Sequence, residues 1–169
     1  EAAARGQAAL GDTLNGPAPV LVDLAELMVD MIPHADWCLF EKNGGDATTA
    51  AVTIARAGTG RRKLLVGRGS YHGAVPWCTP SLAGVTAEDR AHILHYDYND
   101  IASLEAAVEQ AKGDLAAILV TAFRHDMAKA LDLPDPAFAR RMRALCDEAD
   151  AALILDDVRA GFRLHLGGS

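Results

Sequence analysis

Two neighbouring carboxylates, Asp156 and Asp157, follow an apolar run at residues 151–155. Such a run is typical of a strand buried on both faces, as in parallel α/β sheets, whose ligands bind beyond the carboxyl ends of the strands. Because a buried carboxylate needs a partner, Asp156 is a candidate to hold a cationic ring nitrogen, with Arg159 or Arg163 as the alternative partner. The pair of acids could also hold Mg²⁺, but no third acid lies nearby in the sequence.

A glycine-rich turn, Asn43-Gly44-Gly45-Asp46, stands between an expected strand and an expected helix. Two glycines let the backbone come close to a ligand, and the first N–H groups of a helix attract phosphate. A plain tight turn is the alternative. The spacing matches neither a Walker loop nor the G-x-G-x-x-G turn of a dinucleotide-binding fold.

A third candidate lies in a loop, where Tyr71 and His72 precede a glycine. A loop aromatic can stack on a planar ligand, and the alternative is a tyrosine that covers the edge of the core. His72 is either an acid or base, or a residue that only forms hydrogen bonds.

The elements that would position these residues alternate along the chain. Apolar spacing predicts a helix over residues 20–32, which Pro33 limits, and a helix over residues 46–57, which Gly58 and Gly60 end. Residues 67–90 form a long loop without periodicity, and such loops are often functional. The other expected elements are strands at residues 37–40, 63–66, 92–96, 115–120 and 151–155 and helices that begin at Asp100 and at Asp135-Pro136. This alternation predicts an α/β domain with a mostly parallel sheet and helices on both faces.

The composition excludes several classes of protein. A chain of 169 residues can form one domain with a real core, and its net charge of −7 argues against a nucleic-acid partner. The basic run Arg61-Arg62-Lys63 is short and is expected to begin a strand. Nothing resembles a signal peptide or a membrane span. The three cysteines, Cys38, Cys78 and Cys146, are odd in number and widely spaced, which argues against disulfides and zinc and favours a reducing, cytoplasmic compartment.

Cys38 and Cys146 stand in apolar patterns, so we expect both to be small core residues. The two ends of the chain resemble no natural domain boundary. The chain begins inside a helix-like stretch at residues 1–5 and ends shortly after a loop begins, at Leu166-Gly167-Gly168-Ser169. We therefore expect a piece of a longer protein.

These parts occur together, in order, in one known family. The chain resembles the class III pyridoxal-phosphate aminotransferases, including the glutamate-1-semialdehyde aminomutase branch, along nearly its whole length. The last matching stretch is similar to the family's D-E-V-x-x-G-F-R element and is the most specific, and the first is similar to its S-G-T-E-A phosphate turn. The matching stretches are Lys42-Asn43-Gly44-Gly45-Asp46-Ala47, Ala55-Arg56-Ala57-Gly58-Thr59-Gly60-Arg61, Tyr71-His72-Gly73 and Asp156-Asp157-Val158-Arg159-Ala160-Gly161-Phe162-Arg163.

The resemblance implies part of a fold-type-I large domain that binds pyridoxal 5′-phosphate (PLP). Tyr71 would stack on the pyridine ring and Val158 would pack on its other face. Asp156 would pair with the ring nitrogen and keep it protonated, which makes the ring a better electron sink. The two glycines would hold the phosphate. The cofactor-binding residues that the resemblance implies are Gly44, Gly45, Tyr71, His72, Asp156 and Val158.

Five positions, at three places in the chain, depart from the family pattern. Asn43 and Gly45 stand where the family usually has Ser and Thr, so one phosphate-binding hydroxyl is lost. Asp157 replaces the usual Glu of D-E-V. Thr121-Ala122 stand where an acidic residue and a proline are common, which bears on substrate preference more than on cofactor binding.

The Schiff-base lysine of the family lies beyond the D-E-V element. None of the lysines of this chain follows Asp156; they are Lys42, Lys63, Lys112 and Lys129. We therefore read residues 1–169 as part of the PLP-binding large domain, truncated before the lysine segment, and expect no catalytic residue and no metal ligand in it.

The first functional hypothesis is a PLP-dependent aminotransferase that moves an amino group between an amine or amino acid and a carbonyl compound. The full protein would be a homodimer acting on small amino and keto substrates, and the fragment alone would be inactive. A glutamate-1-semialdehyde-type aminomutase is the alternative within the family. A non-catalytic truncated relative that acts as a binding module and a Rossmann-like binder of phosphate ligands are the alternatives outside it.

Overall fold

The computed structural model describes residues 1–11, 18–124 and 131–169. The chain divides into two units, Glu1–Leu39 and Phe40–Ser169, which are described separately. Within the described parts of the chain, no helix combines the length and the apolar character that crossing a membrane requires.

The described part of the first unit contains helices α1 (Ala2–Leu10) and α2 (Pro19–Met31). Pro19 occupies the first turn of α2, where its missing N–H is not needed. Ile32 leaves the helical conformation just before Pro33, because a proline disfavours a helical residue in front of it. The helix predicted over residues 20–32 is therefore confirmed, shifted by one residue.

The strand predicted at residues 37–40 is wrong. These residues are irregular, and the Trp37 side chain is 63% exposed. A strand needs a neighbour for its backbone hydrogen bonds, and no described strand pairs with this segment. Cys38 is only half-buried, with its thiol 3.9 Å from the Ala25 carbonyl, so it is not the core residue that we expected.

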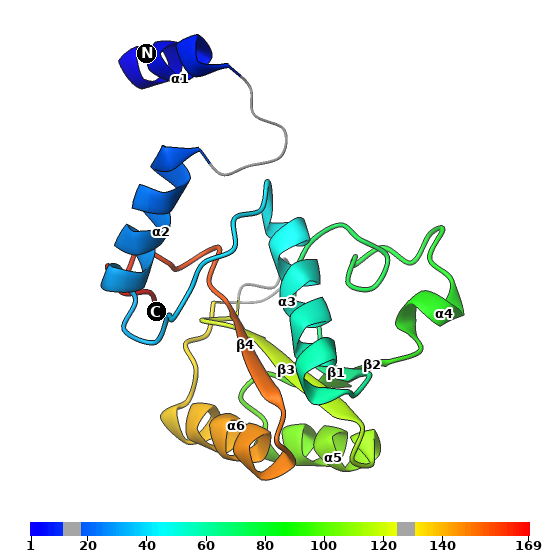
Figure 1. Cartoon of the computed structure of the whole chain (residues 1–169). Coiled ribbons are helices and arrows are strands. Elements are labelled where there is room, and N and C mark those ends of the chain that lie inside the picture. Colours follow the sequence, from blue (N-terminus) through cyan, green and yellow to red (C-terminus); the bar gives the residue numbers. More distant parts are fainter. Residues whose placement is uncertain (12–17, 125–130) are drawn as a thin grey trace. The chain divides into compact units, whose positions relative to one another are not determined.

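The second unit is built on a parallel sheet with the strand order β2-β1-β3-β4 (Figure 1). Its strands are β1 (Lys63–Gly67), β2 (Ile93–Tyr96), β3 (Leu115–Thr121) and β4 (Ala152–Asp156). Its helices are α3 (Gly44–Thr59), α4 (Ala87–Arg90), α5 (Ile101–Ala111) and α6 (Pro136–Ala149). The four strands predicted in this part of the chain and their parallel arrangement are confirmed.

Helices cover both faces of this sheet, as predicted (Figure 1). Successive residues of a strand point to opposite faces. Leu65 packs with residues of α5 and α6 on one face, whereas Leu64 packs with Val52 and Ala55 of α3 on the other. Both leucines are completely buried, which explains why β1 reads as a continuous apolar run.

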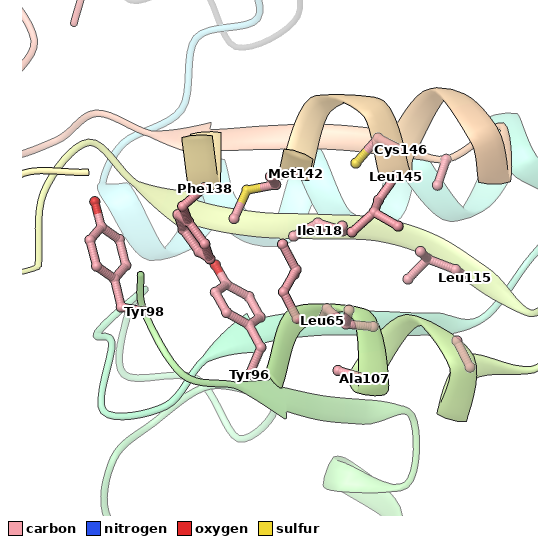
Figure 2. Packing of buried hydrophobic residues seen from close by; sticks show 13 residues of the cluster. Leu65, Tyr96, Tyr98, Ala107, Leu115, Ile118, Phe138, Met142, Leu145 and Cys146 are labelled. Carbon is pink, nitrogen blue, oxygen red and sulfur yellow. The ribbon is translucent and has the colours of Figure 1, made fainter. Parts of the chain in front are cut away.

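An aromatic cluster lies at one end of the core between the sheet and helices α5 and α6. Here Phe138 of α6 packs against two tyrosines (Figure 2). The ring centroid of Phe138 lies 6.1 Å from that of Tyr96 and 5.5 Å from that of Tyr98. The tyrosine hydroxyls donate to the carbonyls of Leu119 and Thr121 at 2.9 and 3.4 Å. Burial raises the pKa of both phenols, that of Tyr98 to about 12, so both remain neutral hydrogen-bond donors at ordinary pH.

The expectation that the last strand is buried on both faces is wrong. Among the described strands, β4 has β3 as its neighbour and lies at an edge of the sheet. Leu155 is 43% exposed as a result. The apolar sequence of β4 therefore predicts the strand correctly but not its burial.

Two aspartates explain where helices α5 and α6 begin. Asp100 accepts a hydrogen bond from Ser103 N, and Asp135 accepts one from Ala137 N, so both predicted caps are confirmed. Helix α3 begins at Gly44, two residues before the predicted start. Gly60 ends α3 in a left-handed conformation with φ of 67°, but Gly58, which we expected to help end it, lies inside the helix.

The basic run at residues 61–63 fixes the carboxyl ends of two helices. Lys63 begins β1, as expected, and its ammonium donates to the carbonyls of Gln110 and Ala111 at the end of α5. The guanidinium of Arg61 donates to carbonyls at the end of α6, including that of Asp150 at 2.9 Å. Cations at these ends are favourable because the carbonyls there carry a partial negative charge.

We expect Phe138→Ala to lower the free energy of unfolding of the full-length protein by about 3–5 kcal/mol, because it leaves a cavity between two buried tyrosines. Urea denaturation followed by circular dichroism measures this change. The matched variant Phe138→Leu keeps most of the apolar volume and should lose less. Equal stability of Phe138→Ala and the wild type would contradict this description of the core.

Candidate functional site

The predicted site residues come together around one cavity at the carboxyl ends of the strands. Asp156 is the last residue of β4, and the loop that carries Tyr71 follows β1. The cavity has a volume of about 550 Å³, which lies in the range of small-molecule sites. Its lining includes Asn43, Gly44, Gly45, Asp46, Tyr71, His72, Gly73, Ala74, Val75, Asp156, Val158 and Arg159. All six residues that the sequence singled out line this cavity, although their roles in binding stay predictions.

The glycine turn is the amino-terminal turn of α3, and it presents two backbone donors. Asn43 caps the helix: its side-chain oxygen accepts from Asp46 N at 3.1 Å, and its carbonyl accepts from Ala47 N at 3.1 Å. Within the described residues, the N–H groups of Gly44 and Gly45 have no acceptor. Two unsatisfied N–H groups at the positive end of a helix dipole form a site for an anion such as phosphate.

The loop that carries Tyr71 lies directly against this turn. Gly73 has φ of +129°, and a Cβ atom built on it would lie 2.8 Å from the Cα of Gly45. Only glycine fits there, because this distance is shorter than real Cβ contacts and the backbone conformation disfavours a side chain. The Tyr71 side chain remains 50% exposed at the cavity, so it does not serve only to cover the core.

His72 and Asp156 form a buried pair. His72 Nδ1 lies 2.7 Å from Asp156 Oδ2, and the two side chains are 0% and 7% exposed. An ionised carboxylate only accepts hydrogen bonds, so Nδ1 carries the hydrogen in this pair. The other carboxylate oxygen accepts from Val158 N at 3.3 Å. The expected partner of Asp156 was an arginine or a ring nitrogen, and nothing in the sequence indicates this histidine.

The second ring nitrogen of His72 has a different environment. Nε2 is buried and has no hydrogen-bond partner within the described residues. A buried polar atom normally has a partner, which here must come from a water, a ligand or another segment of protein. Of the two roles open to His72, an acid or base and a residue that forms hydrogen bonds, the bond from Nδ1 to Asp156 favours the second.

The two acids of the doublet have different neighbours. Asp157 accepts hydrogen bonds from the Ser169 hydroxyl at 2.5 Å and from Ser169 N at 3.0 Å, whereas Asp156 faces His72. The pair is therefore not arranged as two ligands of one cation. Arg163, the alternative ion-pair partner, donates to the carbonyls of Val158 and Arg159.

Cys78 lies behind the loop rather than in the cavity lining. Its thiol is 3.6 Å from the Gly73 carbonyl, and burial raises the pKa of this thiol. The group is therefore a neutral packing element and not a nucleophile. Of the described lysines, Lys42, Lys63 and Lys112, none lines the cavity, and Lys129 lies outside the described residues.

A second cavity of about 210 Å³ lies beside α6 and the β3–β4 edge. Its walls are almost entirely apolar, with Phe138, Met142 and Leu153 among them. It contains no charged side chain among its described lining residues, unlike the cavity at Asp156.

We expect Gly73→Ala to destabilise the second unit by about 1–3 kcal/mol, because the new methyl group would meet the Gly45 backbone. Gly45→Ala is the matched control: its Cβ would be 3.4 Å from Asn43 Oδ1, an ordinary contact, so stability should change by less than about 0.5 kcal/mol. Urea denaturation of the full-length variants measures both. Equal losses of stability in the two variants would show that the close approach of the Gly73 and Gly45 backbones does not cause the loss.

Comparison with known proteins identifies a family and several relatives of this chain. The model of the family described as aminotransferase class-III matches residues 14–167. The chain is 51% identical over 174 aligned positions to the aminopentol aminotransferase of Sphingopyxis macrogoltabida, and the alignment covers 99% of this chain and 41% of that protein.

Two solved structures share the fold. The PLP internal aldimine form of the FumI protein of Sphingopyxis sp. MTA144 is 51% identical with a TM-score of 0.91, over 96% of this chain and 39% of that one. A glutamate-1-semialdehyde aminomutase from Pseudomonas aeruginosa PAO1 is 26% identical with a TM-score of 0.76, over 92% of this chain and 36% of that one. The chain thus spans about two fifths of the length of these proteins.

Proposed function

The chain belongs to the class-III aminotransferase family and has part of a fold-type-I transferase architecture, and we propose that the full-length protein is a PLP-dependent aminotransferase. It would move an amino group between an amine or amino acid and a carbonyl compound. Residues 1–169 would form part of its PLP-binding large domain. The observation that supports this proposal best is the single cavity shared by the glycine turn, Tyr71 and Asp156.

The residues of the cavity fit the cofactor. The N–H groups of Gly44 and Gly45 offer donors to a phosphate, even though Gly45 lacks the hydroxyl that the family usually has there. At another part of the cavity wall, the Asp156 carboxylate offers an acceptor for a protonated ring nitrogen. Tyr71 and Val158 are 50% and 63% exposed, so both present accessible surface to a planar group.

Each of these residues has a task that follows from its contacts. PLP, when bound, supplies an electron sink for the electron pair that remains after a substrate loses its α-proton. Asp156 holds the proton on the ring nitrogen by its negative charge. His72 Nδ1 donates to Asp156 and so favours the ionised carboxylate and fixes its orientation. Asn43 satisfies the inner N–H groups of α3, which leaves the outer two for the phosphate.

The lysine that the chemistry needs would come from a part of the protein outside residues 1–169. None of the described lysines lies at the cavity, so we propose that the isolated chain has no transferase activity. We also propose a homodimer, as the family resemblance implies, and a cytoplasmic location, which the three free thiols of the chain support. Small amino and keto compounds would be the substrates.

Within the family, we favour transfer over an internal shift of the amino group. The aminotransferase relative is 51% identical, whereas the solved aminomutase is 26% identical. A non-catalytic binding module stays the alternative that the absent hydroxyl at Gly45 motivates. The Asp156–His72 pair argues against it, because a chain without a cofactor has no evident need for a buried carboxylate there.

The experiment is reconstitution of the full-length protein with PLP. We expect an absorbance band near the edge of the visible range, which borohydride removes, and transfer of an amino group from a donor amine to a keto acid. Asp156→Asn should lower kcat by about 10²–10³-fold, because the charge that holds the ring proton is lost. Asp157→Asn is the matched control and should stay within about threefold of the wild type, since Asp157 faces Ser169.

Two outcomes would contradict the proposal. The absence of the band in the reconstituted wild type would favour the non-catalytic alternative. Equal losses in Asp156→Asn and Asp157→Asn would remove the special role of the first acid.

A further inference from the structure

We propose that Thr48 is a positioning residue, whose hydroxyl holds the Tyr71-His72 segment against the glycine turn of α3. Thr48 is a buried polar residue, 7% exposed, in the second turn of this helix. Its consequence for PLP rests on the proposed function, whereas the contact itself does not. Thr48 was not among the residues that the sequence singled out.

The hydroxyl makes its shorter contact across the sequence. Thr48 Oγ1 lies 2.7 Å from the carbonyl oxygen of His72 and 3.2 Å from that of Gly45. A hydroxyl has one hydrogen to donate, and the shorter distance assigns it to His72. The hydrogen bond thus connects α3 to a segment 24 residues further along the chain.

A neighbouring threonine holds the same loop at a later point. Thr49 Oγ1 accepts from the indole N–H of Trp77 at 3.1 Å and lies 2.8 Å from the Gly45 carbonyl. This contact fixes residue 77, but it leaves the peptide between His72 and Gly73 unconstrained. Gly73 and Gly45 touch without a directional bond, and the Cys78 thiol contacts the next carbonyl, that of Gly73, at 3.6 Å. The Thr48 hydrogen bond acts on the His72 carbonyl itself and so sets the orientation of that peptide.

The orientation of this peptide matters because His72 uses both its backbone and its ring. Its carbonyl accepts from Thr48 while its Nδ1 donates to Asp156 at 2.7 Å. A displaced backbone would lengthen the second bond and would also move Tyr71, the preceding residue. Thr48 therefore acts on the ring-nitrogen end of the site through His72 and on the stacking surface through Tyr71.

The first test uses the full-length protein without PLP. Thr48→Val keeps the shape of the side chain but removes the hydroxyl, and leaves a buried carbonyl without its donor. We expect the amides of residues 71–78 to exchange hydrogen about tenfold faster in this variant, measured by mass spectrometry. Thr48→Ser keeps the hydroxyl and should exchange within about twofold of the wild type. Thr53→Val removes an exposed hydroxyl that bonds only within α3, so its amides should also exchange within about twofold of the wild type.

The second test adds PLP. We expect Thr48→Val to bind PLP about tenfold more weakly and to shift the pH midpoint of the cofactor absorbance, since His72 no longer holds Asp156 in place. Thr48→Ser should restore both the dissociation constant and the midpoint. A residue that merely stabilised the fold would not move the midpoint. Should Thr48→Val not fold, Thr48→Ala takes its place in the comparison with Thr48→Ser.

Wild-type exchange and PLP binding in Thr48→Val would overturn the proposal. Equal impairment of Thr48→Ser and Thr48→Val would also overturn it, because a retained hydroxyl would then fail to preserve the site, and packing at this position rather than the hydrogen bond would explain the loss. If the wild-type protein itself does not bind PLP, the proposed function fails, but the exchange experiment still decides whether Thr48 holds the loop.

Discussion

The hydrogen bond between His72 and Asp156 is the interaction on which the rest of the site depends. It joins the segment after β1 to the last residue of β4, two parts of the chain that are 84 residues apart. Both side chains are buried, and a buried carboxylate is costly unless a donor faces it. The backbone must therefore place the two residues within 2.7 Å, and the loop and the strand end must be held where they are.

The sheet and its helices hold the loop and the strand end in these positions. The central strand β1 is buried on both faces, between α3 on one side and α5 and α6 on the other. The loop that follows β1 starts from this fixed position and then touches α3 through Gly73 and the Thr48 hydroxyl. Helix α3 thus has two tasks: its buried face contributes to the core, and its first turn offers two N–H groups to the cavity.

The sequence predicted the parallel sheet, the helices on both faces and all six lining residues, because these depend on local patterns. Apolar runs mark β1 and β3, Asp100 and Asp135 mark helix starts, and the residue types themselves mark the glycine turn and the doublet. Val158 was implied only by the resemblance to the family. Predictions that depended on a neighbour were less successful. Residues 37–40 have apolar side chains but no partner strand, and β4 has the sequence of a central strand but lies at an edge.

The contacts inside the site were also beyond the reach of the sequence. Nothing local to His72 indicates that Asp156 will face it, and Thr48 looks like any helical threonine until the loop returns to it. The helix start at Gly44 has a simpler reason: Asn43 is a good cap, and this shifts the start of α3 by two residues.

The most direct measurement is the protonation state of the cofactor's ring nitrogen, followed by ¹⁵N NMR in the full-length protein with ring-¹⁵N PLP. We expect a protonated nitrogen in the wild type at neutral pH and an unprotonated one in Asp156→Ala. An unprotonated nitrogen in the wild type, or the same chemical shift in both proteins, would contradict the role of Asp156 and with it our account of the site.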